Sequence, residues 1–431
     1  MGEQTNSFSH PFSFPIVLPL LLAVVLWTGC AEPEAPAPSL QTGAETLIVD
    51  GFDALDGQRV GLIVNHTARV DTAHLIDRVD RAPNVEIGAL FGPEHGLRGT
   101  ADAGEKVADG VDDRTGAPIY SLYGTNRQPT AEQLEGLDAL VFDIQDVGAR
   151  FYTYISTMGL AMQAAAEHDL PFIVLDRPNP LGGNYVSGFV REPEQTSFVG
   201  QYPIPIAHGL TVGELARMIR GEAMLPGLES LDLRVVELTG WDRNTRWPAT
   251  GREWTPPSPN LPTFETALVY PGACFFEATS ASAGRGTQRP FLQLAASWPE
   301  GAGQTLADTL NARGLPGVAF DPVTFTPQSI PNMASSPRLE GTALRGVRYR
   351  ITDAKTFAPV EAGVHVLHAF YQHAVARGDT LIARPEWLAR LAGTPRLQTL
   401  LGRGARPTAI IQAWTDEVNA FRTRRQPYLL Y

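Results

Sequence analysis

Short apolar runs of strand length recur through the first half of the chain, at residues 60–64, 85–90, 137–142, 171–175 and 233–238. The segments between them include stretches with the periodicity of helices. These predicted helices span residues 73–79, 156–167 and 211–220. Strands that alternate with helices indicate a mainly parallel sheet with helices packed on it. We therefore expect an α/β fold, with a Rossmann-like, mainly parallel sheet domain over residues 47–289.

The pattern changes in the last third of the chain. Residues 258–262 contain two prolines and cannot form regular structure. Residues 346–351 then alternate between apolar and polar side chains, as a half-exposed strand does, and residues 362–376 and 410–423 have helical spacing. We expect a smaller α+β domain over residues 290–431, with a cleft between it and the first domain.

The first thirty residues are predicted to lie outside the fold. Residues 15–27 are apolar, which is too short to span a bilayer but fits the core of a signal peptide. Small residues precede Cys30, as in a bacterial lipoprotein cleavage box, so Cys30 is the predicted lipidation site. Residues 31–46 are rich in Pro and Ala and are interpreted as a tether. We expect an exported periplasmic or outer-envelope lipoprotein that contacts the membrane only through its lipid anchor.

Composition narrows the range of partners. The 431 residues carry a formal net charge of −12 and no long basic run, which argues against nucleic acid as a partner. There are only two cysteines. If Cys30 carries lipid, Cys274 has no partner for an internal disulfide. Its neighbours are apolar, so we expect a buried thiol that behaves as a small hydrophobic residue.

Acidic residues follow three of the predicted strands. Glu94 lies beyond the strand at 85–90, Asp143 directly follows the strand at 137–142, and Asp176 directly follows the strand at 171–175. Because the carboxyl ends of parallel strands meet at one edge of a sheet, where ligands bind in open α/β folds, we expect these acids to form one catalytic cleft.

Long blocks of the sequence resemble a known family. They are residues 91–96, 103–106, 120–124, 141–148, 152–154, 175–183, 258–260, 284–287 and 428–431. The chain is similar in these blocks to the DUF1343 or YbbC-like family, whose characterised members are exo-β-N-acetylmuramidases of the NamZ type (glycoside hydrolase family 171). The resemblance implies a Rossmann-like domain, a smaller second domain and a cleft between them. It also implies release of N-acetylmuramic acid from the non-reducing end of a peptidoglycan-derived muropeptide or disaccharide, without a cofactor.

Two positions depart from the family pattern. Ala283 stands where a Glu commonly precedes the Gly-Arg-Gly sequence, and Ser280 stands where Asn is usual. If relatives bind sugar through either position, affinity or specificity differs in this chain.

Glycoside cleavage usually requires two carboxyl groups, one of which protonates the departing oxygen. The family's Pro-Glu-His-Gly block assigns that acid/base role to Glu94. The second group is left open among Glu105, Asp143, Asp146 and Glu277, with Asp143 favoured by its place at a strand end. A mechanism in which the 2-acetamido group of the substrate is the nucleophile also stays open.

Further residues are predicted to bind the substrate or to influence Glu94. His95 either bonds the sugar or sets the ionisation of Glu94. The lactyl carboxylate of muramic acid calls for a fork-shaped donor, and the candidates are Arg150, Arg177 and Arg285. The other predicted substrate-binding residues are His66, Gln145, Asp146, Tyr154, Asp176, Asn179, Asn260 and Glu277.

Other classes of function fit the sequence less well. No G-x-G-x-x-G follows a first strand and no P-loop is present, which disfavours a nucleotide enzyme. The nucleophile elbow of serine hydrolases is absent as well. Two alternatives remain. One is a metal-dependent hydrolase, in which His66, His95, Asp143, Asp146 and Asp176 would surround a cation. The other is a non-catalytic envelope lipoprotein that binds peptidoglycan fragments, which the departure at Ala283 keeps open.

Overall fold

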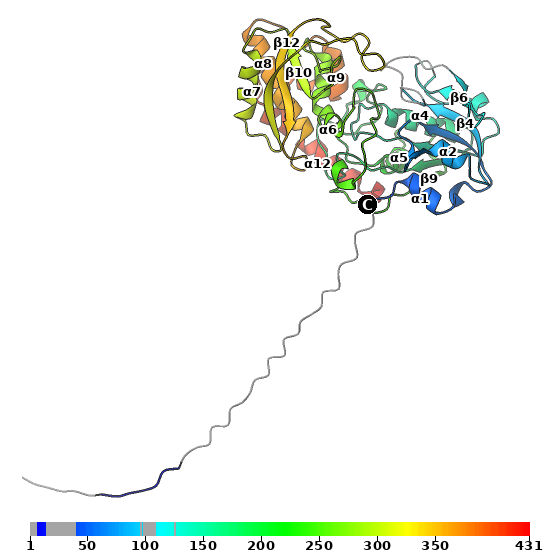
Figure 1. Ribbon diagram of the computed structural model, residues 1–431, viewed down its shortest axis with the longest axis horizontal. Helices are drawn as coiled ribbons and strands as arrows, with labels where there is room; N and C mark the ends of the chain where they lie inside the picture. The colour runs from blue at the N-terminus through cyan, green and yellow to red at the C-terminus, as the bar shows by residue number, and fades with distance from the viewer. Residues whose placement is uncertain (1–6, 14–39, 95–96, 98–108, 125) are drawn as a thin grey trace, which may run out of the picture. The chain divides into compact units, whose positions relative to one another are not determined.

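The computed structural model describes residues 7–13, 40–94, 97, 109–124 and 126–431 (Figure 1). Residues 38–431 form one compact unit. The predictions for Cys30, His95 and Glu105 lie outside the described residues. Within the described part of the chain, no helix is long and apolar enough to cross a membrane.

The larger sheet has seven strands in the order β5-β6-β4-β1-β7-β8-β9. Every neighbouring pair is parallel except β5 and β6. From β6 to β9 this is the order of a doubly wound Rossmann sheet, which confirms the predicted fold class. The strands are β1 Arg59–Val64, β4 Glu86–Gly92, β5 Gly110–Val111, β6 Pro118–Ser121, β7 Ala139–Asp143, β8 Phe172–Leu175 and β9 Leu233–Val236.

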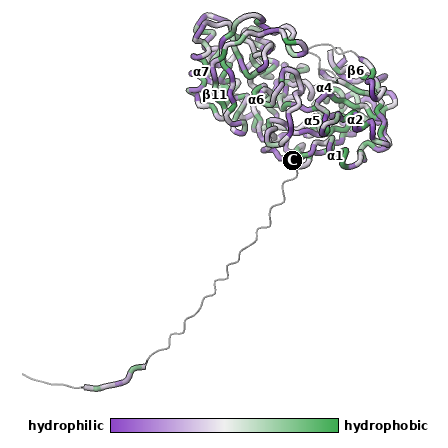
Figure 2. The backbone as a smooth tube through the Cα atoms, in the orientation of Figure 1, coloured by the Kyte–Doolittle hydropathy of each residue, from purple (hydrophilic) through white to green (hydrophobic). Residues whose placement is uncertain are grey.

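Alternate side chains of these strands point to two different hydrophobic layers. Leu62, Val141 and Ile173 belong to a cluster that includes apolar residues of α1 and α2. Their neighbours Phe142 and Val174 belong to a second cluster, which includes apolar residues of α4 and α5. Helices therefore cover both faces of the sheet, and Figure 2 shows the apolar segments that supply these layers. The helices of this region are α1 Gly43–Val49, α2 Leu75–Val79, α3 Ala131–Leu134, α4 Tyr154–Glu167 and α5 Val212–Gly221.

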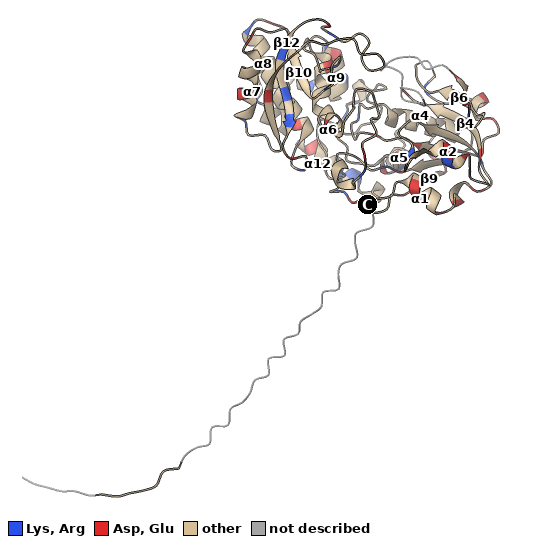
Figure 3. Ribbon diagram, viewed as in Figure 1, with Lys and Arg blue, Asp and Glu red and all other residues tan. Residues whose placement is uncertain are grey.

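A second sheet follows later in the chain, with the antiparallel order β10-β12-β11. Its strands are β10 Gln293–Ala296, β11 Val318–Phe325 and β12 Leu344–Ile351. Arg348 and Arg350 on β12 pair with Asp321 on β11, and Figure 3 shows basic residues along β12. The helices of this region are α6 Phe264–Ala273, α7 Ala302–Asn311, α8 Pro359–Ala376, α9 Pro385–Ala392, α10 Arg396–Gly402, α11 Pro407–Gln412 and α12 Thr415–Arg424, with the 3-10 helix η4 at Cys274–Ala278.

One hydrophobic cluster runs through both regions. It contains Phe142 and Val174 from the larger sheet as well as Leu294 and Val347 from the smaller one. Helices α6 and α8 approach each other at glycine: a Cβ atom on Gly272 would lie 2.1 Å from the Pro359 carbonyl oxygen. A larger residue there would force the helices apart. The shared cluster packs the second region on the first, and the contact at Gly272 fixes α6 against α8 within the second region.

The structure differs from the predicted elements in two places. Order begins before residue 47, because Thr42 and Glu45 form a capping box that starts α1 at Gly43. The helix predicted at 410–423 is two helices, α11 and α12. Trp414 lies at the break, is buried, and packs edge-on against Phe189 at 5.1 Å between ring centroids.

Candidate active site

Glu94 lies just beyond the carboxyl end of β4, beside the start of α4. Thr153, the N-cap residue of α4, makes no side-chain capping bond. Its hydroxyl group donates instead to Glu94 Oε2, at 2.9 Å. The end of β4 and the beginning of α4 thus hold this carboxyl group from two sides.

Glu94 lines a cavity of about 630 Å³, which is within the size range of small-molecule sites. The walls come from loops of the larger sheet, from the segment 258–291 and from helix α9. The polar and aromatic lining residues include Glu94, Tyr123, Arg127, Thr153, Tyr154, Ser197, Phe198, Asn260, Tyr270, Glu277, Arg285, Trp387 and Arg390. Of the predicted site residues, the structure brings Glu94, Tyr154, Asn260, Glu277 and Arg285 together.

Tyrosines surround the Glu94 side of the cavity. Burial and the neighbouring charge of Glu94 raise the pKa of Tyr123 to about 12. The same two causes act on Tyr154, whose pKa is also raised. The Tyr154 hydroxyl donates to the Pro257 carbonyl oxygen at 2.6 Å, and its ring packs edge-on against Tyr152 at 4.9 Å. These phenols stay protonated near neutral pH, and the single O–H of Tyr154 is used by the Pro257 carbonyl oxygen.

Glu277 is the second carboxylate among the described residues of this cavity. Its Oε1 accepts a hydrogen bond from Arg285 Nε at 2.6 Å. Burial works against the charge of Arg285, but the charge of Glu277 keeps the pKa of Arg285 above its usual value. The guanidinium group also lies over the Phe291 ring, 5.1 Å from its centroid. This pair is therefore an ion pair on the cavity wall.

Asn260 and Cys274 complete this wall. The Asn260 amide group donates to the Met333 carbonyl oxygen, whereas its Oδ1 is buried and accepts no hydrogen bond from the described residues. Cys274 is buried and forms no disulfide, as predicted, and burial raises its pKa, so the thiol stays protonated.

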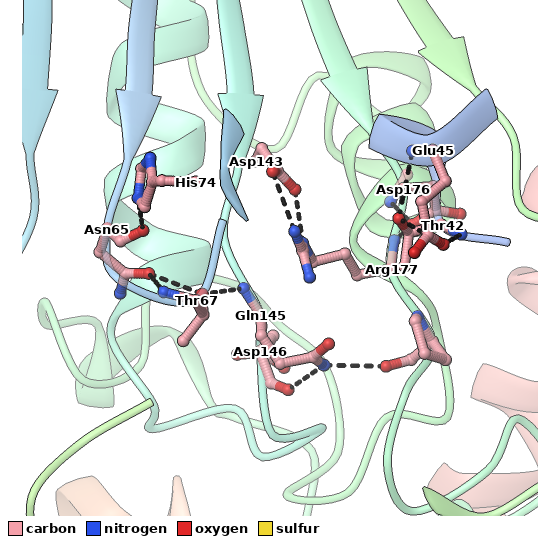
Figure 4. A network of polar contacts seen from close by, with 12 residues as sticks. Thr42, Glu45, Asn65, Thr67, His74, Asp143, Gln145, Asp146, Asp176 and Arg177 are labelled. Atoms are coloured by element: carbon pink, nitrogen blue, oxygen red, sulfur yellow. Dashed lines mark hydrogen bonds and ion pairs between the residues drawn. The ribbon is translucent and has the colours of Figure 1, made fainter. Parts of the chain in front are cut away.

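Asp143 and Arg177 form a separate buried pair at the ends of β7 and β8 (Figure 4). Arg177 donates through Nε to Asp143 Oδ1 and through Nη2 to Oδ2, the latter at 2.9 Å. Asp143 is fully buried, and both of its oxygens are used. Arg177 and Gln145 line a different cavity, of about 650 Å³, next to Trp254.

Asp176 is also occupied by the fold. Its oxygens accept from the backbone N–H groups of Arg177 and Gly213 and from the hydroxyl groups of Thr211 and Tyr431. The three acids that follow strands therefore do not share one cleft: Glu94 lines the cavity of about 630 Å³, and the other two are buried in polar contacts of their own.

The remaining predicted residues lie outside the cavity that Glu94 lines. Arg150 is fully buried and donates to three backbone carbonyl groups. Asp146 Oδ2 accepts from the Gly148 N–H at 2.6 Å, and Asn179 bridges the backbones of Leu181 and Leu210. A ring nitrogen of His66 bonds the Pro256 carbonyl oxygen. Within the described ranges, no group of three or more His, Cys, Asp and Glu side chains is arranged to hold a metal ion.

The sequence reasoning missed several residues of the cavity. Tyr123 and Thr153 lie inside blocks that carry the family resemblance, so a signal for them existed. Arg127, Trp387 and Arg390 had none: two of them come from α9, which is distant in sequence and reaches the cavity only through the packing of the second region.

Two family models match the chain. The model described as exo-β-N-acetylmuramidase NamZ, N-terminal, matches residues 60–265, and the corresponding C-terminal model matches residues 268–431. A protein of Bacillus subtilis (strain 168), described as peptidoglycan β-N-acetylmuramidase NamZ, is 40% identical over 425 residues. The match covers 97% of this chain and 99% of that protein.

Solved structures agree with this result. Two crystal structures of DUF1343 family proteins from Bacteroides fragilis NCTC 9343 resemble the chain, and each match covers 91% of this chain and 99% of the other. The first has a TM-score of 0.82 and 39% identity. The second has a TM-score of 0.74 and 33% identity.

Proposed function

This chain belongs to the exo-β-N-acetylmuramidase NamZ family, and on that basis we propose that it is a glycosidase acting on peptidoglycan fragments. Its reaction releases N-acetylmuramic acid from the non-reducing end of a muropeptide or disaccharide. The observation that carries this proposal is the cavity in which Glu94, held by Thr153, shares the walls with a second carboxylate, Glu277. Two carboxyl groups around one sugar-sized space are what glycoside hydrolysis requires.

Glu94 is assigned the acid/base role. In this role the carboxyl group gives its proton to the glycosidic oxygen as the bond breaks, and takes a proton from water when the product forms. The Thr153 hydroxyl holds Oε2 at 2.9 Å, which fixes the direction of the carboxyl group. Tyr123 and Tyr154 line the cavity with Glu94.

Glu277 is assigned as the second carboxylate. Arg285 holds Glu277 on the cavity wall, where its carboxylate can stabilise the positive charge that develops at the anomeric carbon, either directly or through the 2-acetamido group. Asn260 Oδ1, which accepts no hydrogen bond from the described residues, suits the N–H of that acetamido group.

The test compares two disaccharides that differ in which sugar is at the non-reducing end. Purified protein is incubated with a disaccharide ending in N-acetylmuramic acid and with one ending in N-acetylglucosamine, with and without a chelator. Release of N-acetylmuramic acid from the first alone, unchanged by the chelator, supports the proposal. Loss of turnover on chelation would favour a metal-dependent hydrolase, and binding without turnover would favour a non-catalytic receptor.

We also propose that the protein is exported and carries lipid on Cys30. The support is the apolar segment 15–27 followed by small residues before the cysteine. Labelled palmitate should enter the wild-type protein in a bacterial host and not the Cys30→Ala variant. Equal labelling of both would contradict the lipid anchor.

A further inference from the structure

The cavity lined by Glu94 has an excess of positive charge. Its described lining residues include three arginines, Arg127, Arg285 and Arg390, and two carboxylates, Glu94 and Glu277. Arg285 is neutralised by Glu277, to which it donates at 2.6 Å. The chain as a whole carries a net charge of −12. A local excess of arginine in an acidic protein indicates an anionic ligand.

Arg127 is held in a position suited to binding an anion. It lies in the loop between β6 and α3, and its guanidinium carbon is 4.4 Å from the centroid of the Phe198 ring. Both residues line the cavity. Stacking uses the flat face of the guanidinium group and leaves its N–H edge for hydrogen bonds. Among the described residues, no carboxylate forms an ion pair with Arg127. Its N–H edge can therefore donate hydrogen bonds to a carboxylate of a ligand.

Arg127 and Glu94 line the same cavity, together with Tyr123. The charges of both residues act on the Tyr123 hydroxyl: the charge of Glu94 favours its protonated form, and the charge of Arg127 opposes this. A carboxylate bound by Arg127 would therefore lie in the same cavity as the glycosidic oxygen that Glu94 is proposed to protonate. On N-acetylmuramic acid, that carboxylate is the lactyl group. Arg390 comes from α9, in the second region of the chain.

We propose that Arg127, stacked on Phe198, is the residue that binds the lactyl carboxylate and so selects N-acetylmuramic acid. This inference rests on the proposed glycosidase function and adds a specificity residue to it. It differs from the sequence-based candidates, because Arg150 and Arg177 lie outside this cavity and Arg285 is paired with Glu277.

The test uses two chromogenic glycosides of N-acetylmuramic acid, one with the free lactyl carboxylate and one with its primary amide. The amide has nearly the same shape and no charge. For Arg127→Ala, kcat/KM on the carboxylate should fall roughly 10- to 100-fold, as expected for a lost charge-assisted hydrogen bond. The amide substrate should lose less than about threefold, because it has no charge for Arg127 to bind.

Two further variants make the result specific. Arg127→Lys should recover only part of the lost kcat/KM, because an ammonium group cannot form the fork. Arg403→Ala removes an exposed arginine next to α10, away from the cavity, and should leave both substrates unchanged. Thermal unfolding of each variant checks that the fold is retained.

The outcomes separate this inference from the proposed function. If the wild type turns over neither glycoside, both the proposed function and the Arg127 assignment are overturned. Normal wild-type turnover with an equal loss on carboxylate and amide in Arg127→Ala would overturn the Arg127 assignment alone. A selective loss in Arg390→Ala, with none in Arg127→Ala, would assign carboxylate binding to Arg390 and also overturn the Arg127 assignment.

Discussion

The Tyr431 hydroxyl group donates a hydrogen bond to Asp176 Oδ2 at 2.7 Å, across 255 positions of sequence. The same hydroxyl oxygen accepts the Leu238 N–H at 2.8 Å, and the Tyr431 ring packs edge-on against Trp241. After passing through the second region, the chain thus returns to the ends of β8 and β9. This contact ties the C-terminal residue to the larger sheet.

Replacing Tyr431 by Phe should destabilise the protein without unfolding it. The change leaves the Leu238 N–H without its acceptor and takes one donor from buried Asp176. We expect the free energy of unfolding to fall by about 1–3 kcal/mol, the usual cost of a buried unsatisfied group. Denaturant unfolding measures this. The control is Tyr371→Phe, because the Tyr371 hydroxyl makes no hydrogen bond among the described residues. Equal effects of the two changes would show that the hydrogen bonds of Tyr431 do not stabilise the fold.

Asp176 should make stability depend on pH. Burial raises the pKa of this carboxyl group from its usual 3.8 to about 6, although four donors oppose the shift. The folded state therefore holds the proton more tightly than the unfolded state does. The resulting stability is present below pH 3.8 and is lost as the pH rises through about 6.

The size of this effect is roughly 3 kcal/mol, from about 1.4 kcal/mol for each tenfold change in proton affinity. From pH 4 to pH 7, the unfolding free energy of the wild type should fall relative to that of Asp176→Asn, because the variant cannot ionise. The two curves should therefore converge or cross. Parallel curves for the two proteins would show that Asp176 does not titrate in this range.

Much of the fold was predictable from local sequence, because strands buried on both faces are continuous apolar runs. The run at 60–64 became β1, and Thr211 with Glu214 formed the capping box that starts α5. The start of α1 was not predicted, because its capping box lies next to a segment rich in Pro and Ala. The break at Trp414 was also missed, because α11 and α12 share one apolar periodicity and only tertiary packing separates them.

The site was less predictable than the fold. Glu94 could be chosen because it follows a strand within a family block. The position of Asp143 at a strand end does not reveal that Arg177 takes both of its oxygens. The sequence also does not show that Trp387 and Arg390 line the same cavity as Glu94, which precedes them by hundreds of positions. Such contacts depend on how the two regions pack, which no local pattern encodes.

Arg150 is expected to stabilise the fold rather than bind substrate. Its guanidinium group donates to the carbonyl oxygens of Phe189, Ile204 and Leu391 at 2.8–2.9 Å, and burial, with the charge of Arg191, lowers its pKa to about 9. Arg150→Met should lower the free energy of unfolding by about 3 kcal/mol, because carbonyl groups lose their donors. The KM of the folded variant should stay near the wild-type value, and a large rise in KM with normal stability would restore a substrate-binding role.

We expect Glu277 to contribute to kcat more than to substrate binding. Glu277→Gln keeps the size of the side chain and removes the charge that faces Arg285. We expect kcat to fall by about 100-fold or more, since the second carboxylate stabilises charge that develops in the transition state. The control is Glu265→Gln on the exposed start of α6. A rise in KM with unchanged kcat would mean that Glu277 only positions Arg285.

The most direct test of the account is the rate at which Glu94→Gln releases N-acetylmuramic acid from a disaccharide that carries it at the non-reducing end. The glutamine retains the side-chain oxygen that accepts from Thr153 but has no proton to give. We predict a loss in kcat/KM of roughly 10²–10⁴-fold at an unchanged thermal midpoint, with Glu135→Gln, an exposed residue next to α3, at the wild-type rate. A folded Glu94→Gln variant that works at nearly the wild-type rate would contradict the central claim.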